Sequence, residues 1–258
     1  MKKTVFASAA MCMLGATAAF AQAPANYPVK TVRVIVPFAP GGGSDFIARA
    51  VSPSLSKAMG QQFVVDNRPG AGSTLGSEIA LKSPADGYTL LLVGSSFGVN
   101  PSLYKKLPYD SERYLAPITL ASTASQILVV NPSLPVNTVQ DLIKLAQAKP
   151  GELNFGSSGN GGGPHLAGEL FTQMSGIKMI HVPYRGTSEN ITALLARQID
   201  CVANSNSWAP NVEAGQLRLL AVWTRERLGA FPNAPTLRDL GYDMVVTSPY
   251  GITGPKGL

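Results

Sequence analysis

The chain has 258 residues, of which 45% are apolar and 14% are charged, a balance typical of a globular protein with a large buried core. Its formal charge of +6 comes from 21 basic and 15 acidic residues. The basic residues are scattered and form no stripe with interleaved aromatic residues, so this composition argues against a nucleic-acid-binding protein and suits a small acidic ligand.

The first 21 residues have the pattern of a signal peptide. Lys2 and Lys3 precede an apolar run from Val5 to Phe20, and Ala19-Phe20-Ala21 is the small-x-small pattern that signal peptidase reads. The run is shorter and richer in alanine than a membrane anchor, and no later run approaches the roughly 20 apolar residues of a spanning helix. We therefore expect cleavage near Ala21, a periplasmic location and a soluble mature chain.

A strand, a glycine-rich turn and a helix follow this leader. The apolar run from Val32 to Phe38 is followed by "APGGGSD", and the helical spacing of apolar residues begins around Ser44 and continues to residue 59. The first turn of a helix presents N–H groups without an intrahelical partner, and glycine allows another group to approach the main chain closely. This stretch predicts a site for a small anion: a nucleotide phosphate, a reaction intermediate or a bound carboxylate.

Strands and helices continue to alternate beyond this turn. The predicted elements are a strand over 62–66, a short helix over 75–81, a strand over 87–96, a helix from Thr138 to Lys149, and three strand–helix units with helices over 164–174, 188–196 and 208–214. Thr138 and Asp141 have the spacing of a capping box. Runs of aliphatic and β-branched residues between helical patterns indicate an α/β fold with a parallel sheet covered on both faces.

Two long apolar segments, 115–130 and 244–255, predict a strand that crosses from one lobe to a second and a strand that returns. The predicted domains are the signal peptide at 1–21, the N-terminal part of lobe 1 at 22–120, lobe 2 at 121–246 and a return to lobe 1 at 247–258. Ligand binding is expected to close the lobes about hinges near residues 118–126 and 245–252.

The cysteines provide no disulfide framework. Cys12 lies in the predicted signal peptide, so the mature chain retains one cysteine, Cys201, which excludes an intramolecular disulfide. Cys201 lies in "IDCVANS", a predicted buried strand. We interpret it as an inert core residue, with a catalytic thiol as the alternative.

The sequence contains no complete catalytic, metal-binding or nucleotide-binding motif. Ser157, Ser158 and His165 are close in sequence, but neither serine has the flanking glycines of a nucleophile elbow. His165 and His181 are the only histidines, and no cysteine or carboxylate cluster accompanies them at metal-ligand spacing. No Gly-x-Gly-x-x-Gly or Gly-Lys-Ser/Thr motif is present. We predict a binding protein without metal or cofactor; an enzyme that uses His165 and a serine on a carboxylated substrate is the alternative.

Several ordered motifs identify a family. The stretches "VRVIVPFAPGGGSDFIAR", "QQFVVDNRPGAGSTLG", "HLAGELF", "HVPYRG" and "APTLRDLGY" resemble the Bug-type periplasmic solute-binding proteins of tripartite tricarboxylate transporters, over nearly the whole mature chain. The resemblance implies a two-lobed periplasmic binding protein fold of type II, the Venus flytrap, and capture of a small carboxylate by a monomer. It implies membrane permease subunits as partners; a sensor kinase that reads the bound carboxylate is the alternative partner.

The resemblance also implies a ligand-binding set. Gly42, Gly43 and Ser44 match the family's first binding loop and would hold one carboxylate. Asp45 follows them and is expected to stabilise the first helical turn, where its charge complements the helix dipole. The residues expected to hold the far end of the ligand are Ser157, Gly159, Gly161, His165, Arg185, Gly186 and Thr187. Ser95, at the end of a predicted strand, is a further candidate.

Two departures from the family pattern bear on this set and on the chain's stability. Asn204 stands where an aspartate is common, which makes a ligand amino group at that position less favoured, because an amide lacks the aspartate's charge. The resembled family continues after "YGITGPKG" into C-terminal helices that complete lobe 1. Since this sequence ends at Leu258, those helices are expected to be missing, and the chain to be poorly stable and to bind weakly.

Overall fold

The computed structural model describes residues 26–205 and 208–258, with only the backbone described for Asn204 and Ser205. The predicted signal peptide and its cleavage site therefore lie outside the described residues. Within them, a nine-stranded mixed sheet has the order β2-β1-β3-β9-β4-β7-β5-β6, and β8 pairs with β4. The strands are β1 (Val32–Val36), β2 (Phe63–Asn67), β3 (Thr89–Val93), β4 (Leu115–Val130), β5 (Asn154–Ser157), β6 (Ile180–Pro183), β7 (Cys201–Ser205), β8 (Arg218–Val222) and β9 (Thr247–Pro255).

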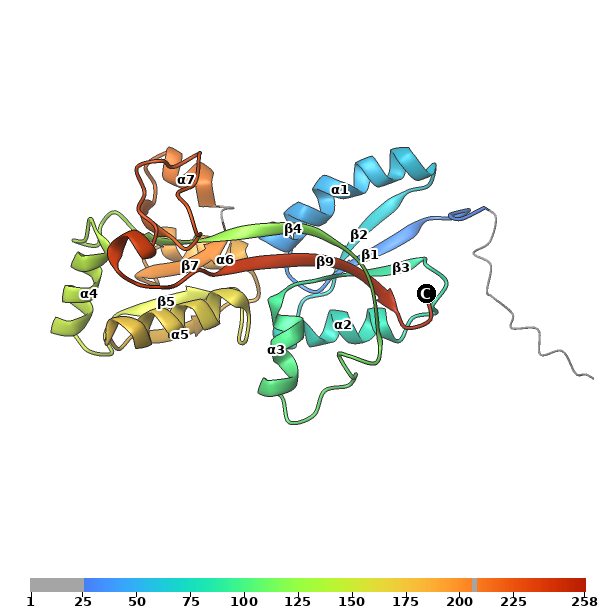
Figure 1. Cartoon of the computed structure of the whole chain (residues 1–258), viewed down its shortest axis with the longest axis horizontal. Helices are drawn as coiled ribbons and strands as arrows, with labels where there is room; N and C mark the ends of the chain where they lie inside the picture. Colours follow the sequence, from blue (N-terminus) through green and yellow to red (C-terminus); the bar gives the residue numbers. More distant parts are fainter. Residues whose placement is uncertain (1–25, 206–207) are drawn as a thin grey trace, which may run out of the picture.

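The sheet belongs to two lobes joined by two long strands. β1, β2 and β3 pair in parallel in the first lobe, and β5, β6 and β7 pair in parallel in the second. β4 pairs with β9 over Leu115 to Ser125 and then with β7 over Gln126 to Val130, so it runs through both lobes. Figure 1 shows β4 and β9 side by side as the connection between the two groups of helices.

The predicted parallel sheet is present within each lobe, and the two connecting strands, predicted to cross and to return, are antiparallel to their neighbours. β9 runs antiparallel to β3 and to β4, and β4 runs antiparallel to β7 and β8. The reason is topological, because one strand leaves the first lobe and the other returns to it along the same path. The predicted range of the crossing strand, 115–130, coincides with β4.

Helices cover the sheet in both lobes. They are α1 (Gly43–Met59), α2 (Thr74–Leu81), α3 (Ser95–Leu103), α4 (Val139–Ala148), α5 (Gly163–Ser175), α6 (Thr187–Leu195) and α7 (Ala209–Glu213). The capping box predicted at the start of α4 is present: Thr138 Oγ1 accepts from the Asp141 N–H, and the Asp141 carboxylate accepts from the Thr138 N–H. None of the described helices is long and apolar enough to cross a membrane.

One helix differs from the sequence prediction. The strand predicted over 87–96 ends at Val93, and Ser95 begins the helix α3. Gly98 and Pro101 within α3 are weak helix formers, so the local sequence gives little helical signal there. Ser95 therefore lies at the start of a helix and not at the end of a strand.

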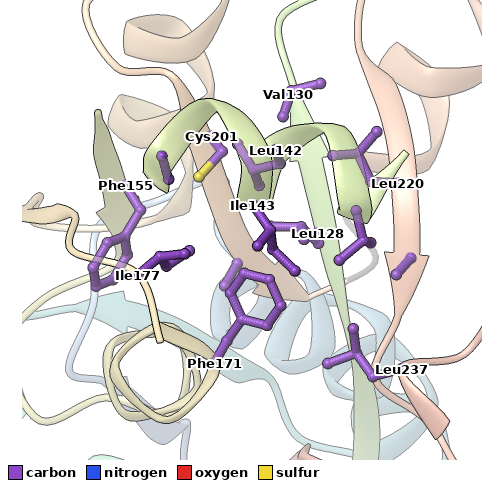
Figure 2. Close-up of a cluster of buried hydrophobic side chains, with 14 of the residues drawn as sticks. Leu128, Val130, Leu142, Ile143, Phe155, Phe171, Ile177, Cys201, Leu220 and Leu237 are labelled. Carbon is purple, nitrogen blue, oxygen red and sulfur yellow. The ribbon is translucent and has the colours of Figure 1, made fainter. Parts of the chain in front are cut away.

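The hydrophobic core of the second lobe contains Cys201. Figure 2 shows Cys201 among Phe155, Leu142 and Phe171, between the sheet and the helices α4 and α5. Cys201 is 2% exposed, and burial, together with the charge of Asp200, raises the pKa of its thiol. A thiol that stays protonated is a poor nucleophile, so this residue packs as a small apolar side chain.

Candidate functional site

Four helices begin at one cavity between the lobes. The cavity encloses about 40 Å³, and the residues at its wall include the N-cap residues of α1, α3, α5 and α6. These N-cap residues are Gly42, Gly94, Gly162 and Gly186. α1 and α3 belong to the first lobe and α5 and α6 to the second, so both lobes direct positive helix ends at the same space.

None of these four helices has a side-chain cap. The N-cap glycines have no side chain, and no side-chain hydrogen bond caps any of the four first turns. α4 provides the contrast inside the same molecule, because its first turn is closed by the Thr138–Asp141 capping box and does not line the cavity. A capping side chain satisfies N–H groups that an anion could otherwise bind. The cavity is therefore built from helix starts that have no side-chain cap.

Hydroxyl groups complete the wall of the cavity. Ser44 and Ser95 come from the first lobe, Ser158 and Thr187 from the second, and Ser248 from the connecting strand β9. Among the described residues, those that line the cavity carry no charged side chain. The same part of the chain contains no group of three His, Cys, Asp or Glu residues that could hold a metal ion. The cavity therefore attracts an anion through helix dipoles, N–H groups and hydroxyls.

Asp45 is held away from the ligand space by its own partners. Its carboxylate accepts hydrogen bonds from the Gly41 N–H at 2.9 Å, from Asn67 Nδ2 at 2.9 Å and from Arg49 Nε at 2.9–3.0 Å. Asp45 is 4% exposed and does not line the cavity. Burial alone would raise the pKa of Asp45, but the hydrogen bonds from Arg49, Gly41 and Asn67 outweigh it and lower the pKa. Its charge is thus neutralised locally, and it fixes the glycine turn.

A second pocket continues from the cavity. It has a volume of about 360 Å³ and shares Phe38 and Ser158 with the cavity wall. Gly159 and Arg185 line it from the second lobe, and Tyr104 lines it from the first. A molecule whose anionic head occupies the cavity could therefore extend into this pocket.

The structure separates the predicted site residues into groups. The cavity wall contains Gly42, Gly43, Ser44, Ser95, Gly186 and Thr187. Gly159 and Arg185 line the adjoining pocket. Asp45, Ser157, Gly161 and His165 line neither space. The side chain of Asn204 lies outside the described part of the chain, although its backbone pairs with Ile127 in β7.

Sequence reasoning missed part of the wall. Gly94 and Ser96 belong to the start of α3, which the sequence prediction placed in a strand. Ser248 and Tyr250 come from the returning strand β9. The first pair could have been found from the glycine–serine run after an apolar strand, the same signal as at residues 41–44. The second pair has no local signal, because only the return of β9 places it at the cavity.

The lobes touch each other beside the cavity. The Ser188 hydroxyl donates to the Pro40 carbonyl oxygen at 2.9 Å. A Cβ atom placed on Gly186 would lie 3.0 Å from the Ala39 Cβ, and one placed on Gly42 would lie 3.4 Å from Thr187 Oγ1. The absence of side chains at these two glycines lets the lobes approach, so the structure shows the cleft in a closed form.

The alternative hypothesis is an enzyme that uses His165 and a serine. The cavity wall does not contain His165 or Ser157. Ser157 is fully buried, and its hydroxyl oxygen lies 2.6 Å from Nε2 of His181. Nδ1 of His165 accepts from the Gly161 N–H at 3.0 Å. A buried hydroxyl that does not face the ligand space cannot attack a bound substrate.

Sequence and structure comparisons identify the family. A family described as "Tripartite tricarboxylate transporter family receptor" matches residues 47–258. The chain belongs to this family of solute receptors. It is 38% identical over 251 residues to the UPF0065 protein in the gbd 5′ region of Cupriavidus necator, covering 97% of this chain and 76% of that relative.

Solved structures of relatives share the fold of this receptor. The R. palustris protein Rpa4515 with adipate has a TM-score of 0.87 and 33% identity, covering 90% of this chain and 78% of that one. The periplasmic binding protein BugD has a TM-score of 0.84 and 30% identity, with the same coverage. The receptor therefore has the two-lobed periplasmic binding protein fold and is a periplasmic solute receptor, not an enzyme.

Proposed function

We propose that this receptor captures a small carboxylate between its lobes and presents it to the membrane permease subunits of a tripartite transporter. The observation that supports this most directly is the convergence of four helix starts without side-chain caps on one cavity. Such helix starts favour an anion, and the uncharged hydroxyl-rich wall suits a carboxylate that accepts several hydrogen bonds.

The dimensions of the two spaces support a ligand with one carboxylate in the cavity and a longer remainder. A volume of about 40 Å³ is room for roughly three water-sized groups, which is the scale of one carboxylate. The adjoining pocket of about 360 Å³ provides space for a carbon chain, and Arg185 at its wall favours a second acidic group. The binding of adipate by a relative is consistent with this division.

We assign the ligand contacts accordingly. The N–H groups of Gly42, Gly43 and Ser44, with the Ser44 hydroxyl, hold the carboxylate from the first lobe. Gly186 and Thr187 hold it from the second lobe, and Ser95 adds a hydroxyl from α3. In this assignment Gly159 and Arg185 contact the distal part of the ligand. Asp45, Ser157, Gly161 and His165 shape the loops and make no direct contact.

Opening and closing would take place where the connecting strands change partners. β4 pairs with β9 up to Ser125 and with β7 from Gln126 onward. β9 begins its pairing with β4 at Thr247. These points lie within the hinges expected near 118–126 and 245–252. We propose lobe 1 at 22–120 with the return at 247–258, and lobe 2 at 121–246, as the two moving bodies.

A thermal-shift series tests the carboxylate assignment. A dicarboxylate such as adipate at 100 times its dissociation constant should stabilise the receptor by about 2.7 kcal/mol. The matched control is the corresponding diamide, which has the same length and no charge. Stabilisation by the acid and not by the diamide supports the proposal, whereas equal stabilisation by both would exclude a carboxylate site.

A sensor kinase remains the second candidate for the partner. The closed cleft would suit recognition by either partner, since both read the ligand-bound form. Adjacent genes for two membrane permease subunits would support transport, and an adjacent gene for a histidine kinase would support sensing.

A further inference from the structure

Two histidines stack on each other beside the loop 157–163, which contributes to the cavity wall from the second lobe. The rings of His165 on α5 and His181 on β6 have centroids 3.8 Å apart and are inclined by 16°. The chain contains no other histidine. The cavity wall includes neither ring, so the assignment of ligand contacts leaves their role open.

Each ring is bonded to a different part of the loop 157–163. Nδ1 of His165 accepts from the Gly161 N–H at 3.0 Å. Nε2 of His181 lies 2.6 Å from the Ser157 hydroxyl, where the loop begins. The loop residues Ser158 and Gly162 line the cavity, so the two rings fix the backbone on either side of ligand-facing atoms.

The bond to Gly161 requires an unprotonated nitrogen. A neutral imidazole has one acceptor nitrogen, whereas a protonated imidazole has two donors and no acceptor. Protonation of His165 at Nδ1 would therefore place two N–H groups opposite each other and break this bond. Stacking adds a second constraint, because two charged rings at 3.8 Å would repel each other.

We propose that His165 and His181 are positioning residues that hold the loop 157–163 in its ligand-binding form, and that protonation of His165 in acidic solution releases the loop and weakens ligand binding. The part of the proposal that concerns binding rests on the proposed function of the cavity. The part that concerns the loop can be measured without a ligand.

The surroundings of the rings favour the neutral forms. Glu169, one turn along α5, has Oε1 3.8 Å from Nε2 of His165 and favours its charged form, but burial outweighs it and lowers the pKa of His165. On β5, His181 faces the uncharged residues Ser157 and Phe155. On β7, which also packs against α5, the titratable side chain is the buried thiol of Cys201. His165, His181 and the loop 157–163 that they hold form a latch. Near neutral pH both rings are neutral, so the latch keeps its hydrogen bonds.

Nuclear magnetic resonance of the ligand-free receptor tests the latch directly. Untagged protein gives two imidazole signals, and the variant H165N assigns them. The pH is lowered from about 7.5 through the range in which the His165 ring titrates, and exchange protection of the Gly161 amide should fall in parallel. H165N keeps an acceptor oxygen at the place of Nδ1 but does not titrate, so protection should persist across this range. Unchanged protection after the His165 ring has titrated, or a ring that stays neutral until the protein unfolds, would overturn the proposal.

Binding of adipate as a probe tests the functional consequence. Wild-type affinity should fall by up to about tenfold per pH unit once His165 begins to titrate, the slope of one linked proton. H165N should restore binding at acidic pH, and H165F, which keeps a ring without an acceptor, should bind more weakly at every pH. H165F with wild-type affinity and pH dependence would refute a positioning role. Absence of adipate binding at every pH would count against the proposed function, while the amide measurement would still decide the role of the latch.

Discussion

The Ser188 hydroxyl donates a hydrogen bond of 2.9 Å to the carbonyl oxygen of Pro40, and this bond links α6 of the second lobe to the turn before α1 in the first. The two residues are 148 positions apart in the sequence. A contact of this kind exists only while the cleft is closed. It therefore stabilises the closed form relative to the open form, and with it the bound ligand.

Substitution S188A should weaken ligand binding by about two- to thirteenfold, because one hydrogen bond contributes about 0.5–1.5 kcal/mol. The loss should lie mainly in a faster dissociation rate, which stopped-flow fluorescence would measure. S83A is the matched control, since the Ser83 hydroxyl bonds to the Ile79 carbonyl within its own turn. Equal dissociation rates for S188A and wild type would show that this contact does not hold the cleft shut.

Two glycine-to-alanine substitutions test the assignment of the cavity. The methyl group of one would enter the cavity, and the methyl group of the other would meet no neighbouring atom. A Cβ atom on Gly163 would lie 2.8 Å from Ser95 Oγ and 3.1 Å from Ser248 Oγ, so G163A should fill the cavity and prevent closure around a carboxylate. A Cβ atom on Gly98 would meet nothing within 4 Å, so G98A should leave binding intact and stabilise α3 by about 0.5–1 kcal/mol. Isothermal titration calorimetry and thermal unfolding of both variants measure these effects. Tight binding by G163A would contradict the assignment of the cavity.

Much of the fold follows from local patterns in the sequence. The range of β4 was predicted because its apolar run is unbroken, and α4 was predicted because a capping box and an apolar stripe agree at its start. α3 was missed because Gly98 and Pro101 weaken its helical signal, so the helix depends on packing of Phe97 against its neighbours. β9 is antiparallel to β4, as expected of a strand that returns along the path of the crossing strand.

The candidate site was predictable where a glycine-rich turn begins a helix. Gly42 could be proposed from its glycine-rich turn and Gly186 from the resemblance of its loop to the family's, and both lie where the lobes meet. Ser248 reaches the same cavity only because β9 returns across the molecule, which no local pattern encodes. The family resemblance assigned His165 to the ligand, whereas its Nδ1 accepts a hydrogen bond from the Gly161 N–H of the neighbouring loop.

Asp45 provides a prediction for the pH dependence of stability. Its folded-state pKa is lowered, so its carboxylate stabilises the fold above the unfolded-state pKa of 3.8, and this contribution disappears as the pH falls through the folded-state pKa. D45N should therefore lose about 1.5–3 kcal/mol of unfolding free energy near neutral pH, the value of hydrogen bonds to a charged group. Urea unfolding of wild type and D45N should show this difference shrinking as the pH falls from about 5 to about 2. A difference that stays constant over that range would mean that the charge of Asp45 is not what stabilises the turn.

His181 provides the last prediction, which concerns the whole fold and not only the loop. Burial, followed by the charge of His165, lowers the pKa of His181 to about 4 from an ordinary value of 6.5. Between these two pH values the folded form therefore binds fewer protons than the unfolded form. The contribution of His181 to the unfolding free energy is greatest above about pH 6.5 and declines as the pH falls toward about 4. H181F keeps a ring in the stack but cannot titrate, so its unfolding free energy should depend on pH less steeply, by up to one proton, within this window. Urea unfolding at several pH values measures both slopes, and the acidic residues common to the two proteins cancel in the comparison.

H181F loses the bond to Ser157 and is expected to be less stable at every pH, so the slope and not the absolute stability is decisive. Identical slopes for H181F and wild type would show that His181 is protonated equally in the folded and unfolded forms.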